Sequence, residues 1–223
     1  NQYAIINNQI KNKFLKKRFF SRLIGPKYRD SKKIKIKINN RYLISKINDE
    51  NMCFIYSFAK LLKIRDNSFI SALKTFKGLS HRFEMFLKKR NITFIDDSKA
   101  TSFTASQLAL SSLKNIYWIL GGLPKKGDRL NFTKYKKNII KCYIIGKHIN
   151  FFKDQIKGKL PFSITKNLKN SLAKIIEDIN YQEKFNKTVL LSPAAASFDQ
   201  FINFEMRGKE FKRLSKTYAK KLI

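Results

Sequence analysis

The chain has 223 residues, of which 43% are hydrophobic and 13% aromatic, so it can bury a core and is not intrinsically disordered. It has no apolar run of the ~18–20 residues that span a bilayer. Its two cysteines, Cys53 and Cys142, stand in no Cys/His cluster. The cysteine pattern therefore excludes a disulfide scaffold and a zinc module, and it fits a reducing cytoplasm. Its 48 Lys and Arg against 15 Asp and Glu give a net charge of +33, which leaves an anionic partner open.

We expect the first 50 residues to be rich in β-strands. Residues 3–6 form a short apolar run, and residues 33–38 alternate strictly between Lys and Ile, which is typical of a strand with one buried face. Asn39 and Asn40 follow, and asparagine tolerates the positive φ that a tight hairpin turn needs. The apolar residues 42–44 come next, so the pattern predicts a hairpin around this Asn pair.

Two helices are predicted after this β-rich segment. The first begins at Asn51, and its apolar residues share one face: Met52, Ile55, Ala59 and Leu62. The second begins near Ser68, which we expect to be its N-cap, and ends at Gly78. We place a domain boundary near residues 77–80.

Beyond this boundary the pattern alternates between strands and helices. We expect strands at 83–87, 92–95, 116–120, 142–145 and 188–191, the first two as a hairpin. We expect helices at 101–113, around 168–179 and around 211–218. Short apolar strands separated by helical patterns predict an α/β fold whose mostly parallel sheet is covered on both faces.

Polar segments follow three of the predicted strands. They are residues 96–101, 121–127 and 192–199, and they offer Lys, hydroxyl and backbone N–H groups. Ligands of open α/β sheets bind beyond the carboxyl ends of the strands, so these groups suit a carboxylate or a phosphate there. A purely structural interpretation stays open, in which Asp96 and Ser98 cap a helix and the Gly121-Gly122 pair permits a turn. No G-x-x-x-x-G-K-[ST] or G-x-G-x-x-G motif occurs in the chain.

In this order, four segments resemble the Mur ligase family. They are GLSHRFE (78–84), DSKAT (97–101), GG (121–122) and LLSPAAASFDQFINFEMRG (190–208). The resemblance covers almost all of residues 45–223, and within the family it points to the members that add D-glutamate. It implies that residues 1–77 are the second half of a central α/β ATP-binding domain. Residues 78–223 would then be the Rossmann-like C-terminal domain that binds D-glutamate.

The resemblance also implies an activity. Family members of this kind are cytoplasmic, ATP- and Mg²⁺-dependent ligases that join D-glutamate to UDP-N-acetylmuramoyl-L-alanine through an acyl phosphate, in peptidoglycan precursor synthesis. We expect no specific nucleic acid, no transmembrane segment and a monomer. Position 1 is Asn and the first Met is Met52. Since the family's phosphate loop, magnesium ligands, carbamylated lysine and uridine-nucleotide domain lie upstream, we expect a fragment that is inactive alone.

Site residues are carried over by position in the matched motifs. The resemblance implies that Lys99 is catalytic and that Thr101, Lys125, Ser197, Phe198 and Phe204 hold D-glutamate. It implies ATP contacts from Asn48, Asn51, His81, Arg82 and Asp97, and no metal ligand. Lys126 stays an alternative to Lys125. The sequence departs from the family's usual residue at Ile47 (His), Ser80 (Pro), Asp96 (Asn) and Ser102 (Asn).

Two other hypotheses stay open. The charge favours a basic nucleic-acid-binding module, although 38 Lys against 10 Arg, spread along the whole chain, is also what compositional drift on solvated faces produces. The third hypothesis is a structural relic that keeps the fold without the chemistry. The ordered motifs favour the ligase.

Overall fold

The computed structural model describes residues 2–14, 21–40, 43, 48–131, 135–179 and 185–222. The chain divides into two compact units, Asn1–Gly78 and Leu79–Ile223. Within the described ranges, no helix has the length and apolar character needed to cross a membrane. The roles that the resemblance assigns to the two parts of the chain stay predictions.

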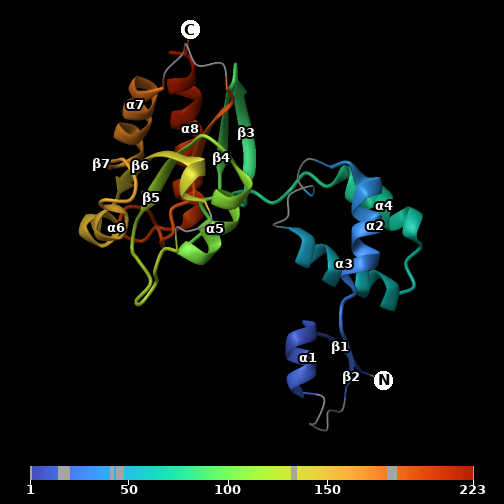
Figure 1. The fold of residues 1–223 in the computed structure, drawn as a ribbon. Helices are drawn as coiled ribbons and strands as arrows, with labels where there is room; N and C mark the ends of the chain where they lie inside the picture. Colours follow the sequence, from blue (N-terminus) through green and yellow to red (C-terminus); the bar gives the residue numbers. More distant parts are fainter. Residues whose placement is uncertain are drawn as a thin grey trace. The chain divides into compact units, whose positions relative to one another are not determined.

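The first unit combines two short parallel strands with a group of helices (Figure 1). Its elements are β1 (Tyr3–Ile5), α1 (Asn8–Phe14), β2 (Arg22–Ile24), α2 (Tyr28–Ile38), α3 (Asp49–Leu61) and α4 (Asp66–Thr75). Helices α2, α3 and α4 pack together around a small apolar core. Its buried residues are Ile34, Ile38, Leu43, Met52 and Tyr56.

The prediction of a strand over residues 33–38 was wrong, because this segment belongs to helix α2. Ile34 and Ile38 are one helical turn apart, so they share a face, where they are only 5% and 3% exposed. Ile36 lies on another side of the helix and is 77% exposed. The alternation of Lys and Ile is therefore compatible with a helix too, and lysine is a better helix former than strand former.

Asn39 and Asn40 end helix α2 instead of forming a hairpin turn. Asn39 has the positive φ that was expected of it, 42°, but uses it as the C-cap of the helix. The Asn40 side chain donates a hydrogen bond of 2.7 Å to the Leu73 carbonyl oxygen in the last turn of α4, which joins the two helix ends. Of the strand expected over residues 42–44, residues 42 and 44 lie outside the described residues, and Leu43 lies in a turn.

Helix α3 is present as predicted, with a buried face that differs in part. Met52 and Ala59 are 1% and 3% exposed, as expected, whereas Ile55 and Leu62 are 42% and 57% exposed. Tyr56 takes their place in the core. The face is rotated because Met52, Tyr56 and Ala59 already form a stripe with i, i+4, i+7 spacing.

Helix α4 begins two residues before the predicted Ser68. Its N-cap is Arg65 and its first residue is Asp66. A carboxylate in the first turn interacts favourably with the helix dipole. Asp66 also accepts a hydrogen bond of 3.2 Å from the Tyr56 hydroxyl of α3, which fixes where α4 starts.

The second unit is built on a six-stranded sheet with the strand order β3-β4-β8-β5-β6-β7. The strands are β3 (Glu84–Lys89), β4 (Ile92–Asp96), β5 (Ile116–Gly121), β6 (Ile139–Ile145), β7 (Phe162–Lys166) and β8 (Lys187–Leu191). β3 and β4 form an antiparallel hairpin, and the other neighbouring pairs in this sheet are parallel. The prediction of an α/β fold with a mostly parallel sheet is confirmed.

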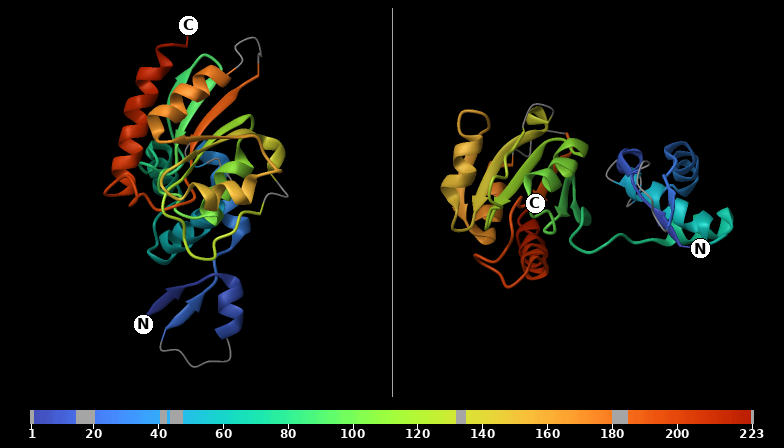
Figure 2. Two further views of the ribbon diagram at one scale, coloured as in Figure 1. Left: turned by 90° about the vertical axis from the view of Figure 1, so that its left-hand side faces the viewer. Right: turned by 90° about the horizontal axis from the view of Figure 1, so that it is seen from below.

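Helices cover both faces of this sheet (Figures 1 and 2). α5 (Phe103–Ser112) and α6 (Ile149–Ile156) pack on one face, and α7 (Leu168–Asp178) and α8 (Phe204–Ala219) pack on the other. Alternate side chains of β5 enter the two cores: Trp118 joins the α5/α6 core, and Tyr117 and Ile119 join the α7/α8 core. Because the central strands β4, β5 and β8 are buried on both faces, they form continuous apolar runs in the sequence.

Helix α6 and strand β7 of this unit were not predicted. Helix α6 has only eight residues, which is too short for its periodicity to stand out. Strand β7 is at the edge of the sheet, and only one of its five residues is buried, so it lacks the apolar run of the central strands. The other three helices were predicted, although α8 begins at Phe204, ahead of the apolar residues that revealed it.

Candidate active site at the carboxyl edge of the sheet

The polar segments that follow β4, β5 and β8 share one edge of the sheet. These three strands are parallel neighbours, so their carboxyl ends lie side by side. Two backbone hydrogen bonds, of 2.9 and 3.0 Å, join Leu123 after β5 to Ala196 after β8. Residues 96–101, 121–127 and 192–199 are far apart in the sequence and therefore meet through the sheet topology.

The Gly121-Gly122 pair does more than permit a turn. Both residues have positive φ, 128° and 134°. A Cβ atom on Gly121 would lie 2.0 Å from the Ile145 carbonyl oxygen, and one on Gly122 would lie 2.3 Å from the Ala196 carbonyl oxygen. The pair therefore lets the segments after β5, β6 and β8 approach each other at the backbone level.

Asp97 directly follows β4 and is held by two hydrogen bonds. Its Oδ1 accepts a bond of 3.1 Å from the Phe83 backbone N–H, and its Oδ2 accepts one of 2.7 Å from the Ser192 hydroxyl. Burial raises the pKa of this carboxyl to about 7, against the opposing effect of both hydrogen bonds. The Asp97 carboxyl therefore changes its charge near neutral pH.

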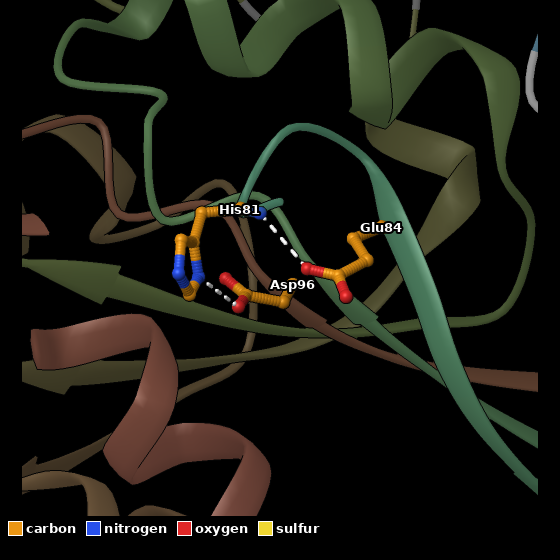
Figure 3. Close-up of side chains that lie close together, drawn as sticks. All are labelled: His81, Glu84 and Asp96. Carbon is orange, nitrogen blue, oxygen red and sulfur yellow. Dashed lines mark hydrogen bonds and ion pairs between the residues drawn. The ribbon is translucent and has the colours of Figure 1, made fainter. Parts of the chain in front are cut away.

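His81 and Asp96 form a buried pair next to this carboxyl (Figure 3). His81 Nδ1 lies 2.7 Å from Asp96 Oδ2, and the two residues are 5% and 0% exposed. The His81 backbone N–H donates a hydrogen bond of 2.9 Å to Glu84 Oε2. Helix α8 packs directly on the pair at Gly208, where a Cβ atom would lie 2.2 Å from His81 Nδ1.

His81, Glu84 and Asp96 lie close enough to one another to be considered as metal ligands. Lys212 of α8 already places a positive charge beside both carboxylates, because its Nζ lies 2.7 Å from Glu84 Oε2 and 3.9 Å from Asp96 Oδ2. An ammonium group at these distances repels a second cation. The residues therefore do not fit a metal ion, and we assign none to them.

Arg207 joins three parts of this edge. Its Nε donates a hydrogen bond of 3.0 Å to Ser98 Oγ, and its Nη2 donates to the carbonyl oxygens of Ser98 (2.8 Å) and Ala195 (2.9 Å). Burial lowers the pKa of the guanidinium to about 10, so it stays charged at neutral pH. One side chain of α8 therefore holds the segment after β4 and the segment after β8 together.

No pattern in the sequence indicated this role for Arg207, and the interpretation of Asp96 and Ser98 as helix caps was wrong. Helix α5 is capped by Ser102, whose hydroxyl accepts a hydrogen bond of 3.2 Å from the Ala105 backbone N–H. Asp96 and Ser98 are instead bound by His81 and Arg207. Only the position of Arg207 inside the matched motif, three residues after Phe204, set it apart from the other basic residues.

Three predicted site residues lie in direct contact. The Lys99 ammonium lies over the Phe204 ring, 3.9 Å from its centroid, and the His81 ring meets the Phe204 ring edge-on at 6.1 Å. The Lys99 backbone N–H donates a hydrogen bond of 3.0 Å to the His81 carbonyl oxygen. The structure thus brings together residues that the resemblance assigned to catalysis, D-glutamate and ATP.

The remaining predicted residues of the second unit lie on the same three segments or beside them. Ser197 is buried, and Phe198 next to it is 69% exposed. Arg82, Thr101 and Lys125 are exposed. Lys126 is exposed as well, so exposure does not decide which of the two neighbouring lysines is the functional one.

Asn48 and Asn51 belong to the first unit. Asn48 is the N-cap residue of α3, and Asn51 is exposed in the first turn of that helix. Both side chains therefore lie at one helix end, as expected of two residues three positions apart. Their predicted contact with a nucleotide stays a prediction.

Sequence comparison finds ligases of one kind. No family model matches the chain. The UDP-N-acetylmuramoylalanine–D-glutamate ligase of Wolbachia sp. subsp. Brugia malayi is 39% identical over 167 residues, which cover 75% of this chain and 33% of that protein. The enzyme of the same name from Rickettsia felis is 32% identical over 183 residues, 82% of this chain and 41% of that protein. The chain thus spans about a third of the length of the curated relatives it matches.

Structure comparison finds the same fold. The MurF ligase of Thermotoga maritima, solved in complex with ADP, matches 78% of this chain and 39% of its own, with a TM-score of 0.54 and 12% identity. The UDP-N-acetylmuramate–alanine ligase MurC of the same organism matches 78% of this chain and 38% of its own, with a TM-score of 0.51 and 14% identity. The chain is therefore similar in sequence to UDP-N-acetylmuramoylalanine–D-glutamate ligases over about a third of their length, and it shares the fold of Mur ligases.

Proposed function

We propose that the chain is the D-glutamate-binding part of an ATP-dependent ligase that joins D-glutamate to UDP-N-acetylmuramoyl-L-alanine. The observation that carries this proposal is the identity of 39% to a ligase of that name, over 167 residues that cover 75% of this chain. We also propose a cytoplasmic monomer. Nothing in the comparisons supports the nucleic-acid-binding alternative.

The proposed reaction has two steps. The carboxylate of UDP-N-acetylmuramoyl-L-alanine takes the γ-phosphoryl group of ATP, which gives an acyl phosphate and ADP. The amine of D-glutamate then attacks the acyl carbon, the amide bond forms, and inorganic phosphate leaves with the electrons of the broken C–O bond. Both steps need positioned reactants and positive charge near the phosphoryl oxygens, and Lys99 is the residue we assign to that charge.

D-glutamate carries two carboxylates, and the carboxyl edge offers groups that suit them. We assign Thr101, Lys125 and Ser197 to the carboxylates, because a hydroxyl donates one hydrogen bond and an ammonium adds charge. Phe198 and Phe204 flank this set on the segment after β8 and at the start of α8. The groups come from three different strand ends, which favours recognition of a ligand with two separated charges.

ATP fits the proposed residues in part. The side-chain amides of Asn48 and Asn51 offer both donors and acceptors, as an adenine edge requires, and the exposed Arg82 offers a guanidinium to a phosphate. His81 and Asp97 would lie beside the nucleotide. Within the 223 residues there is no phosphate-loop motif. We therefore propose that the phosphate loop and the Mg²⁺ ligands belong to the remaining length of the family, and that the 223 residues alone form no amide.

A chimeric enzyme tests this proposal. Residues 79–223 replace the matching stretch of the Wolbachia ligase, and phosphate release is measured with and without D-glutamate. We expect D-glutamate-dependent phosphate release that Lys99→Ala and Lys125→Ala each abolish, with unfolding temperatures close to that of the unchanged chimera. Lys126→Ala is the matched control and is expected to keep the activity.

Two results would contradict the proposal. One is a folded chimera that releases no phosphate with D-glutamate while the unmodified Wolbachia enzyme does, which is what a structural relic would give. The other is unchanged turnover in both the Lys99→Ala and the Lys125→Ala chimera. If Lys126→Ala loses the activity instead of Lys125→Ala, the assignment moves to the neighbouring lysine.

A further inference from the structure

The first turn of helix α8 presents an aromatic ring to Lys99. The Lys99 Nζ atom is 3.9 Å from the centroid of the Phe204 ring, well inside the ~6 Å at which an ammonium is attracted to a ring face. The His81 ring stands edge-on to the same ring, at 6.1 Å and an angle of 79°. Phe204 is therefore held by an aromatic contact as well as by its place in the helix.

The backbones on both sides of this contact are fixed by hydrogen bonds. The Ser98 hydroxyl donates a bond of 2.8 Å to the Phe204 carbonyl oxygen, which links the residue before Lys99 directly to the residue that carries the ring. Arg207, one turn after Phe204, donates to Ser98 Oγ and to the Ser98 carbonyl oxygen. The Lys99 backbone N–H donates to the His81 carbonyl oxygen. The backbones that carry the ring and the lysine side chain therefore belong to one hydrogen-bonded network.

The contact with Phe204 restrains the Lys99 side chain, which would otherwise be mobile. A lysine side chain on a loop loses rotamer entropy when it is held in one conformation, so it stays mobile unless a contact compensates for that loss. A phenyl ring has no hydrogen-bond donor, so the Phe204 side chain cannot itself hold a carboxylate. Its face can hold an ammonium.

We propose that Phe204 is a positioning residue whose ring holds the Lys99 ammonium, and that Arg207 fixes the backbone on both sides of this contact. The function of the contact rests on the proposed function, in which Lys99 acts at the reacting centre. Holding the ammonium before the substrates bind lowers the entropy lost in the transition state. The contact itself is measurable without any ligase activity.

The test is NMR spectroscopy of the 223-residue chain labelled with ¹³C-lysine. The Lys99 side-chain signal is identified as the one that Lys99→Arg removes. Protons over a ring face are shifted upfield, so we expect the Lys99 ε-methylene signal upfield of the other lysines. We expect Phe204→Leu to move it to the position of solvent-exposed lysines and Phe204→Tyr to leave it upfield.

Phe198→Leu is the matched control, since this phenylalanine is 69% exposed on the neighbouring segment. It is expected to leave the Lys99 signal in place, and the Trp118 indole signal reports in each variant that the core is folded. The proposal is overturned if the wild-type Lys99 signal coincides with the exposed lysines. An unchanged signal in a folded Phe204→Leu variant overturns it equally.

The chimera tests the consequence for turnover. We expect Phe204→Leu to lower kcat between about 2- and 30-fold, with a smaller change in KM for ATP, and Phe204→Tyr to restore most of it. Unchanged kcat in Phe204→Leu contradicts the positioning role while leaving the ligase proposal intact. An inactive chimera, together with the expected NMR shifts, would contradict the ligase proposal and would leave the contact between Phe204 and Lys99 supported.

Discussion

Residues at the carboxyl edge of the sheet differ in how far the neighbouring sequence predicts their partners and their roles. Lys99, Thr101 and Asp97 stand in a short motif, and the resemblance of that motif identified them. Arg207 and Ser98 form bonds across 109 positions of the chain, and no local pattern predicts a partner at that distance. The buried network of the site therefore became visible only when the fold placed α8 against the segment after β4.

The raised pKa of Asp97 predicts a pH dependence of stability. The unfolded-state value is near 3.8 and the folded-state value is about 7, so between these pH values the folded chain binds more protons than the unfolded chain. Stability from this carboxyl is complete at low pH and falls as the pH rises towards 7. Asp97→Asn removes the titration, so we expect the variant to gain roughly 4 kcal/mol relative to wild type between pH 4 and pH 8.

Urea denaturation at a series of pH values measures this difference. Asp128→Asn is the control, since the Asp128 carboxylate also accepts a backbone hydrogen bond, of 2.7 Å from the Phe103 N–H. A constant difference between wild type and Asp97→Asn across the whole pH range would show that the Asp97 carboxyl titrates as an exposed one does.

The close packing of Gly208 against the His81–Asp96 pair predicts that a larger residue at position 208 destabilises the chain. A Cβ atom there would lie 2.2 Å from His81 Nδ1 and 2.7 Å from Asp96 Oδ2, and both residues are buried. We expect Gly208→Ala to destabilise the chain by about 1–3 kcal/mol, although alanine is the better helix former. Thermal unfolding measures it, with the neighbouring exposed Lys209→Ala expected to stay within ~0.5 kcal/mol of wild type. Equal stability of the two variants would mean that α8 does not touch the pair.

Among the elements of the sheet domain, the strands that are buried on two faces were all predicted, whereas one edge strand and one short helix were missed. β4, β5, β6 and β8 are central strands, and their apolar runs were unmistakable. The edge strand β7 and the eight-residue α6 carry too little pattern to be recognised. The segment of helix α2 was predicted as a strand because Lys and Ile alternate in it. The same alternation also fits a helix in which Ile34 and Ile38 are buried and Ile36 faces the solvent.

A helix and a strand over residues 33–38 predict different burial of the isoleucines in this segment. In the helix, Ile34 is buried and Ile36 is exposed, whereas in a strand both would share the buried face. We expect Ile34→Ala to accelerate amide hydrogen exchange over residues 28–38 by about 30-fold, equivalent to ~2 kcal/mol, and Ile36→Ala to leave it unchanged. Equal acceleration by both substitutions would support the strand.

At the scale of the whole molecule, the topology of the sheet assembles the site. β8 lies between β4 and β5, although it is the last strand in sequence, and this crossover brings residues 192–199 beside residues 96–101 and 121–127. The sequence predicted that all three segments follow strands, and the resemblance implied that they act together. The order of the strands in space, and with it the contact between Leu123 and Ala196, depends on long-range pairing that composition and periodicity do not encode.

The net charge of +33 predicts weak, salt-sensitive binding to polyanions. Scattered lysines release counterions without recognising a sequence, so affinity for an oligonucleotide should fall steeply as the salt concentration rises to ~0.2 M. Fluorescence anisotropy at increasing salt measures this, and we expect the same curve for oligonucleotides of unrelated sequence. Tight binding that survives ~0.2 M salt would instead favour a dedicated nucleic-acid-binding surface.

An NMR titration of the 223-residue chain with D-glutamate tests the proposed D-glutamate site without requiring ligase activity. We predict saturable shifts confined to the backbone signals of residues 97–101, 121–127 and 192–204, a weaker response to L-glutamate, and loss of the response in Lys125→Ala. Shifts that do not saturate, or that are the same for both enantiomers and for the variant, would contradict a D-glutamate site at the carboxyl edge of the sheet.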